Sequence, residues 1–354
     1  MRRASRILLL SVFVVLLCPP VAIRAQEGLP AQSDYDNGES RVPVFEFHSG
    51  FWVNLHHFLY EQGRLSSGLA LTEGGGAGAE QTDALADLSG LTPAERADWK
   101  SAVAYYAAGI SRGDLISDSE QSQISFELSI REGCADLNGP DCQPPLPRDL
   151  QGLLKALRTS APIYRAHWWP DHDRANRAWI EKVAPLVTQM GVDLASQLAD
   201  IFQEKWPAAK LRVDVVWYAG PLGAYTTLEP AHVTIASHDP RNQGLYSLEV
   251  LFHEASHTLA GGVVFAIQQE CKRREMLIPR DLWHALLYYT TGEVVRRTLA
   301  QEGEAEYTPY AYRYGLYEQR WSDFEHVLAI YWQPYLDGKV DFDHAIEHVI
   351  AALA

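Results

Sequence analysis

Three side chains that can do chemistry together stand within five positions, in the run His253-Glu254-Ala255-Ser256-His257. On an α-helix, residues four apart share one face, so His253 and His257 can direct a ring nitrogen at the same metal ion. Glu254 lies about 100° further round the helix, where it can reach a water held on that ion. The spacing therefore indicates a metal site with a base beside it. A core helix whose histidines are satisfied by hydrogen bonds is the alternative interpretation.

The residues around this motif predict the helix that it requires. Apolar side chains dominate the segment 247–262, and Gly261-Gly262 is a helix stop signal. An H-E-x-x-H motif on a helix resembles that of the zincin metallopeptidases. The resemblance covers the motif helix and, more loosely, the segment around it. It implies that His253 and His257 are zinc ligands and that Glu254 is the general base.

A catalytic zinc needs a third protein ligand and one open position for water. In the gluzincin branch of the family the third ligand is a Glu from a later helix, and the best later helix spans 281–300. Glu293 has apolar neighbours there, among which an unpaired carboxylate would be costly. Glu293 is therefore the predicted third ligand.

Three alternatives to this assignment stay open. Glu293 can instead pair with Arg296 or Arg297, which are three and four residues further along. His284, on the same predicted helix, is the second alternative. It is nine residues before Glu293, hence on the opposite helix face, so the two cannot bind one metal on a straight helix. Glu275 stands at a spacing from His257 that is closer to that of the best-known gluzincins, but it follows three consecutive basic residues, which is typical of a solvated face.

A group of tyrosines follows the predicted helix and surrounds Arg313: Tyr307, Tyr310, Tyr312, Tyr314 and Tyr317. Zincins often use a Tyr, His or Arg to stabilise the oxyanion that forms when zinc-bound water attacks a carbonyl. The resemblance makes Tyr312 and Tyr314 the candidates for this role. Aromatic packing is the alternative role for each of them.

The chain before the motif predicts a small sheet. Residues 211–218 alternate and are rich in β-branched side chains, and 232–237 predicts a second strand. In zincins a strand before the motif helix lies along the cleft and pairs with extended substrate backbone. By this resemblance 232–237 is the edge strand, with His232, Thr234 and Ala236 as substrate-binding residues. An ordinary sheet strand is the alternative.

Two further histidine groups are predicted not to hold a catalytic metal. His56 and His57 are adjacent, so on a helix they point about 100° apart. His344 and His348 match the inverted motif H-x-x-E-H, but the residues that follow, 349–354, contain no His, Cys or acid that could serve as a further ligand. We expect an amphipathic closing helix there.

Residues 1–25 have the composition of a secretory signal peptide. A basic start precedes an apolar run at 7–17, which is too short to span a bilayer as a stable helix. Cleavage is expected after Ala25, so the protein is predicted to be secreted or periplasmic. A lipid anchor on Cys18 fits less well, because the residue before it is Leu17 rather than a small one. A twin-arginine signal also fits less well.

The charge balance excludes two classes of partner. The chain has 30 basic and 45 acidic residues, a net charge of −15, and removing the signal takes away four Arg and no acid. This balance argues against nucleic acid and against an anionic membrane surface as partners. The sequence after the signal has no run that is long and apolar enough for a membrane span.

The cysteines predict one disulfide. Cys134 and Cys142 flank a loop with Gly139-Pro140 at its turn, and such a pair in an exported protein is expected to be bridged. A thiolate metal site would need more ligands than this loop offers. Cys271 is left over and is expected to be buried.

Together these patterns predict an α+β protein that is mostly helical. The expected organisation is a signal peptide at 1–25, a flexible segment at 26–45, a helical lobe at 46–205 and a zincin-like catalytic lobe at 206–354. The resemblance implies an exported metallopeptidase with one Zn²⁺ and a peptide or protein substrate. An amidase acting on another amide, such as a cell-wall crosslink, and a catalytically silent binding protein are the alternatives; an intact Glu254 argues against the last.

Overall fold

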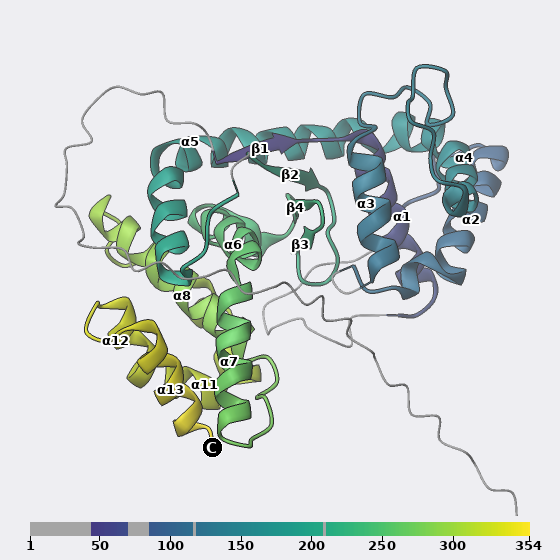
Figure 1. Cartoon of the computed structure of the whole chain (residues 1–354). Helices are drawn as coiled ribbons and strands as arrows, with labels where there is room; N and C mark the ends of the chain where they lie inside the picture. Colours follow the sequence, from purple (N-terminus) through teal and green to yellow (C-terminus); the bar gives the residue numbers. More distant parts are fainter. Residues whose placement is uncertain (1–43, 70–84, 116–117, 208–209) are drawn as a thin grey trace, which may run out of the picture. The chain divides into compact units, whose positions relative to one another are not determined.

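The computed structural model describes residues 44–69, 85–115, 118–207 and 210–354 (Figure 1). The predicted signal peptide, Cys18 and nearly all of the segment 26–45 lie outside the described residues. The described part belongs to one compact unit, Arg41–Ala354. It is mostly helical with one small mixed sheet, which confirms the prediction of a mostly helical α+β protein.

Four strands form the sheet, in the order β1 (Phe45–His48), β2 (Leu211–Val216), β4 (Ala231–Ala236) and β3 (Ala224–Leu228). The β1–β2 and β2–β4 pairs are parallel, whereas β3 runs antiparallel to β4. The two edge strands of the described sheet are therefore β1 and β3. β4 is paired on both sides, so the prediction that 232–237 forms the edge strand is wrong.

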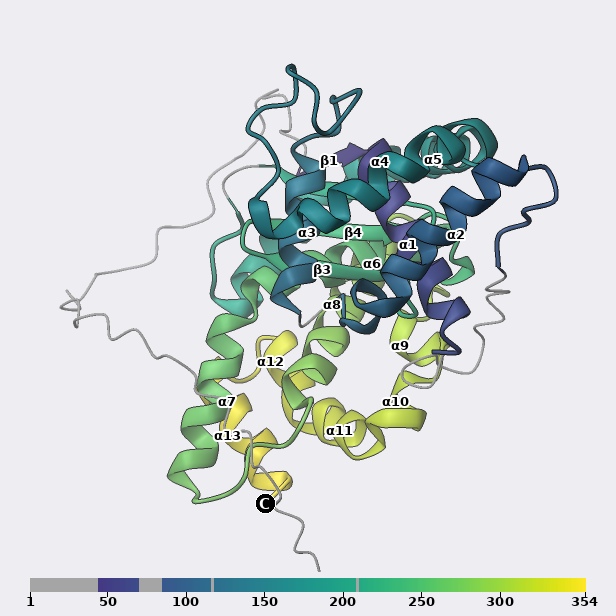
Figure 2. The same cartoon turned by 90° about the vertical axis from the view of Figure 1, so that its right-hand side faces the viewer.

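The first helices of the described chain are α1 (Phe51–Ser66), α2 (Pro93–Ala108), α3 (Ser119–Ser129) and α4 (Gln151–His167). They share a hydrophobic cluster that also takes in Val216 and Tyr225 from the sheet. Figure 2 shows α3 beside β3, where the Ser125 hydroxyl lies 3.0 Å from the Tyr225 hydroxyl.

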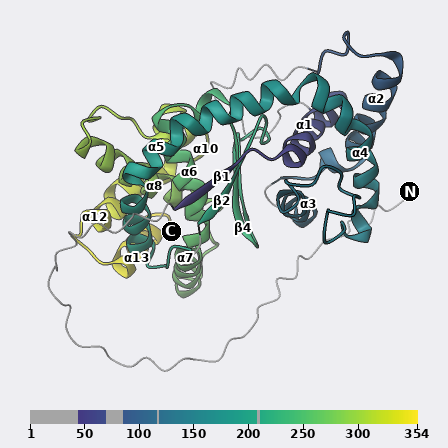
Figure 3. The ribbon, with the colours of Figure 1, turned by 90° about the horizontal axis from the view of Figure 1, so that it is seen from above.

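The long helix α5 (Trp169–Phe202) connects the two halves of the described chain. Figure 3 shows it reaching from α4 towards α8. From Trp179 onwards its buried side chains belong to a second hydrophobic cluster, together with the sheet and the helices that follow. Because β1 also pairs with β2, the predicted lobes 46–205 and 206–354 share one sheet and this second cluster.

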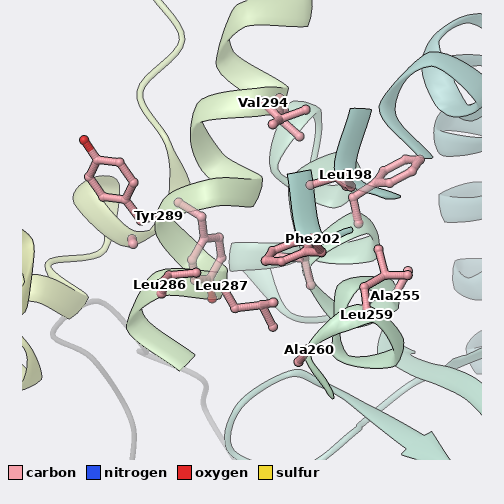
Figure 4. Close-up of a cluster of buried hydrophobic side chains, with 14 of the residues drawn as sticks. Leu198, Phe202, Ala255, Leu259, Ala260, Leu286, Leu287, Tyr289 and Val294 are labelled. Carbon is pink, nitrogen blue, oxygen red and sulfur yellow. The ribbon is translucent and has the colours of Figure 1, made fainter. Parts of the chain in front are cut away.

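The second cluster is built mainly on α6 (Leu245–Ser256), α7 (Gly261–Arg273) and α8 (Leu282–Gln301). Figure 4 shows how side chains of α5, of α8, of the end of α6 and of the turn that follows α6 meet, among them Leu198, Phe202, Ala255, Leu259 and Leu286. This packing fixes α8 against α6. The shorter segments that follow are α9 (Tyr310–Arg313), α10 (Leu316–Arg320), α11 (Ser322–Val327), a π-helix at Leu328–Trp332, α12 (Gln333–Leu336) and α13 (Phe342–Ala352).

Among the described residues, no single helix is long and apolar enough to cross a membrane. The bent pair Leu245–Leu259 and Gly261–Arg273 meets the length and composition criteria only when both helices are taken together.

Candidate metal centre

Three histidines come together from two helices and a turn: His253, His257 and His284. One ligand atom from each lies within 4.8 Å of the other two, and the Nε2 atoms of His253 and His284 are 3.2 Å apart. Two nitrogens at zinc-binding distance from one tetrahedral ion are about 3.3–3.4 Å apart. The spacing therefore suits a single metal ion.

The local structure explains why these rings meet. His253 lies in the last turn of α6, and His257 begins the 3₁₀ turn His257–Leu259 that directly continues it. His284 lies in the first turn of α8, which starts after Asp281 at φ 64°. Because α6 and α8 pack against each other, the start of one helix faces the end of the other.

Glu293 does not lie at this cluster. Its carboxylate accepts hydrogen bonds of 2.8 and 2.6 Å from Arg296 and Arg297, and these guanidinium groups hold its pKa below the usual range despite partial burial. Helix α8 is continuous from His284 to Glu293, so the two side chains occupy opposite faces, as nine helical residues require. The third candidate ligand is therefore corrected from Glu293 to His284.

The error in that prediction has a physical cause. The apolar neighbours of Glu293 in sequence suggested an unpaired carboxylate, but the helix places Arg296 and Arg297 on the same face, where they neutralise it. Glu275, the other acidic alternative, follows α7 with φ 56° and is not part of the cluster.

Burial keeps the imidazoles of the cluster uncharged. It lowers the pKa of His253 well below its usual value, that of His257 to about 3 and that of His284 to about 4, and the neighbouring histidines lower the first two further. Neutral imidazoles have a free lone pair for a metal, and an all-nitrogen donor set suits Zn²⁺ and its first-row neighbours. No described residue hydrogen-bonds to the buried Nδ1 of His253. The residues present thus fit a metal ion.

Glu254 lies beside the cluster rather than in it. One of its carboxyl oxygens is 3.9 Å from His257 Nε2, and the hydroxyl of Thr226 on β3 is 2.8 Å from the same oxygen. Burial raises the pKa of Glu254 to about 7, against the opposing effect of the Thr226 hydrogen bond. A carboxyl group with such a pKa can both take up and release a proton near neutral pH.

A cavity of about 970 Å³ opens onto Glu254, His257 and His284. All five residues of the edge strand β3 line one side of it, and α3 contributes Ser119, Ser122, Gln123 and Phe126 from a single helix face. The remaining wall includes the aromatic side chains Trp283, Tyr288, Tyr310 and Trp321. The candidate metal centre is therefore accessible to a molecule that lies along β3.

The substrate-binding residues predicted on β4 are not in this cavity. His232 is 2 % exposed, and Thr234 and Ala236 are fully buried inside the sheet. β3 takes their predicted place along the cavity. The sequence of β3, Ala-Tyr-Thr-Thr-Leu, contains the β-branched and aromatic residues typical of a strand, which is the signal that sequence reasoning missed.

The predicted oxyanion tyrosines also lie elsewhere. Tyr312 is 44 % exposed and donates a 3.2 Å hydrogen bond to Glu325, and Tyr314 packs against Tyr246 and Tyr310. Neither lines the cavity that contains Glu254. Tyr288 and Tyr310 line it instead.

Tyr288 is closely tied to the histidines. Its ring stacks on that of His253 with 3.6 Å between centroids and 21° between planes. Tyr288 lies four residues after His284 on the predicted later helix, so its place on the same helix face was available from the sequence.

A buried acid supports the position of Tyr310. The carboxylate of Glu249, one turn before His253, accepts hydrogen bonds from the Tyr307 hydroxyl at 2.7 Å and from the Tyr310 backbone N–H at 2.9 Å. Burial raises the pKa of Glu249 to about 7, and these two hydrogen bonds oppose the rise. Glu249 thereby connects the motif helix to the start of α9.

The other predicted groups have structural surroundings. Cys134 and Cys142 form the predicted disulfide, and Cys271 is buried. His56 and His57 are both fully buried, and His57 reaches the Tyr225 hydroxyl at 2.8 Å. His344 of the inverted motif lies against Asp341 and is not part of the metal cluster.

Comparison of the whole chain with protein-family models, with curated proteins and with solved structures finds no match.

Proposed function

We propose that this protein is a zinc-dependent hydrolase of peptide bonds, with His253, His257 and His284 as zinc ligands and Glu254 as general base. The observation that carries the proposal is the placement of Glu254. It is a buried carboxyl beside three clustered imidazoles and it faces the cavity along β3. A bound zinc would supply a water of lowered pKa and a positive charge that polarises a carbonyl.

Glu254 accepts the proton of the attacking water and passes it to the leaving amine. Its position between His257 and the Thr226 hydroxyl leaves its carboxyl group open to the cavity. Tyr288 and Tyr310 present their side chains to the same cavity. Their hydroxyl groups are the proposed donors to the charge that develops on the carbonyl oxygen.

The edge strand β3 is the feature that favours a polypeptide as the substrate. Within the described chain β3 pairs only with β4, so its second backbone edge is available. An extended peptide can add to such an edge through main-chain hydrogen bonds, and the cavity lies along this strand. A peptide added to β3 would have a backbone carbonyl next to the histidines without a requirement for a particular side chain.

The direct test is hydrolysis of an unstructured protein by the purified, zinc-loaded mature chain. We expect cleavage that stops when a chelator removes the metal and returns when zinc is added back. A chain that binds zinc but leaves both this protein and short peptides intact would instead favour a different amide substrate or a binding protein.

A further inference from the structure

The carboxyl group of Glu254 has one hydrogen-bond partner among the residues that the structure describes, the hydroxyl of Thr226. The Thr226 Oγ1 atom is 2.8 Å from a carboxyl oxygen of Glu254 and 2.7 Å from the backbone carbonyl oxygen of Glu254. The nearest nitrogen of His257 is 3.9 Å from this carboxyl oxygen, which is too far for a hydrogen bond.

Thr226 comes from the middle of the edge strand β3, opposite Val233 of β4. The strand itself is anchored from its other face. The next residue towards its start, Tyr225, places its hydroxyl 2.8 Å from His57 Nε2 and 3.0 Å from the Ser125 hydroxyl. The backbone of Thr226 is thus held by the sheet, and its side chain is held by the contact with Glu254 of α6.

We infer that Thr226 is a positioning residue that holds the Glu254 carboxyl towards the reacting water. The inference rests on the proposed function and adds to it a link between the substrate-binding strand and the base. A hydroxyl suits this role because it can donate to a carboxylate and can also accept from a carboxylic acid. Glu254 passes through both forms when it takes a proton and then gives it up.

The two contacts of Thr226 are consistent with this double role. A hydroxyl has one proton, so Thr226 donates either to the carboxylate or to the backbone carbonyl. When it donates to the carbonyl, its oxygen is free to accept from a protonated Glu254. The side chain therefore stays bonded to Glu254 through the whole proposed cycle.

Thr226→Val and Thr226→Ser test the inference in the zinc-loaded full-length mature protein. Valine has the shape of threonine without its hydroxyl, whereas serine keeps the hydroxyl. We expect Thr226→Val to lower kcat by ~10- to 100-fold, the scale of a misplaced catalytic group, with KM and zinc content close to those of the parent. Thr226→Ser should return kcat to within a few-fold of the parent.

Thr298→Val is the matched control, because Thr298 is a buried threonine on α8 whose hydroxyl, among the described residues, accepts a single long hydrogen bond of 3.4 Å from Gln197. It should leave kcat unchanged. A Thr226→Val variant with the kcat of the parent, or one whose loss is not recovered by serine, would overturn the inference.

Crystal structures of the zinc-bound parent and Thr226→Val separate this inference from the proposed function. If the parent cleaves no peptide, the proposed function fails, but the two structures still show whether the carboxyl group of Glu254 moves when the hydroxyl is removed. An unmoved carboxyl group would overturn the positioning role by itself.

Discussion

The Nε2 atoms of His253 and His284 lie 3.2 Å apart, although 31 positions separate the two residues. The packing of α8 against α6 brings them together, since His253 lies in the last turn of α6 and His284 in the first turn of α8. Two uncharged imidazoles with their ring nitrogens face to face are arranged as two ligands of one ion would be.

The first prediction separates His284 from Glu293 as a zinc ligand. His284→Ala should lose most of the bound zinc, because two histidines alone leave the ion too few ligands. Glu293→Ala should keep about one zinc per chain, because its carboxylate is engaged by Arg296 and Arg297. Elemental analysis after dialysis measures both. Loss of zinc from Glu293→Ala with retention in His284→Ala would restore the original assignment.

The second prediction concerns the tyrosines. Tyr288→Phe should lower kcat by ~10- to 100-fold with zinc retained, because it removes a proposed donor to the oxyanion. Tyr312→Phe is the matched control, since its hydroxyl bonds to Glu325 outside the cavity. Steady-state kinetics on one peptide compares the two variants. Equal rates in Tyr288→Phe and the parent would remove Tyr288 from the mechanism.

The third prediction tests the packing behind the metal centre. A Cβ atom on Gly292 would lie 2.8 Å from a Pro309 side-chain carbon and 3.0 Å from the Glu249 carboxylate. Gly292→Ala should therefore displace the start of α9 and lower the free energy of unfolding by about 1–3 kcal/mol. Gly133→Ala, where the new atom meets nothing within 4 Å, is the control. Denaturant unfolding that ranks the two variants equally would contradict this packing.

The fourth prediction concerns acid stability. Burial lowers the pKa of His172 to about 3, and its ring stacks on Trp217. The folded state therefore binds fewer protons than the unfolded state between pH 6.5 and pH 3. The stability that results is fully present above pH 6.5 and is lost as the pH falls.

In metal-free protein, the free energy of unfolding of His172→Gln should fall less steeply with acidification than that of the parent. The slopes should differ by up to about 1.4 kcal/mol per pH unit. Urea unfolding at several pH values between 6.5 and 4 measures both slopes. Parallel slopes would show that His172 does not contribute to acid lability.

The features of the structure that depend on local spacing were predictable from sequence. The H-E-x-x-H motif, its helix and the disulfide each rest on residues within one short segment, and the structure has the helix at Leu245–Ser256 and the bridge at Cys134–Cys142. The mostly helical α+β fold class likewise follows from periodicity along single segments. The strand at Leu211–Val216 was predictable from its alternation.

The parts that depend on which elements become neighbours were not predictable in this way. The strand 232–237 has the composition of an edge or an interior strand, and only its pairing with both β2 and β3 decides between them. His284 and Glu293 stand on one helix, and the sequence shows that only one can face the motif. Which face does so is set by the packing of α8, and the pairing of Glu293 with two arginines gives the physical reason.

The most direct test of the whole account is the rate of hydrolysis by zinc-loaded Glu254→Gln. The amide keeps the shape of the side chain but cannot accept a proton from the attacking water. We expect about one zinc per chain, as in the parent, and a rate of peptide hydrolysis that is ~10²- to 10⁴-fold lower. Full activity of this variant, with the zinc still bound, would contradict the proposed mechanism.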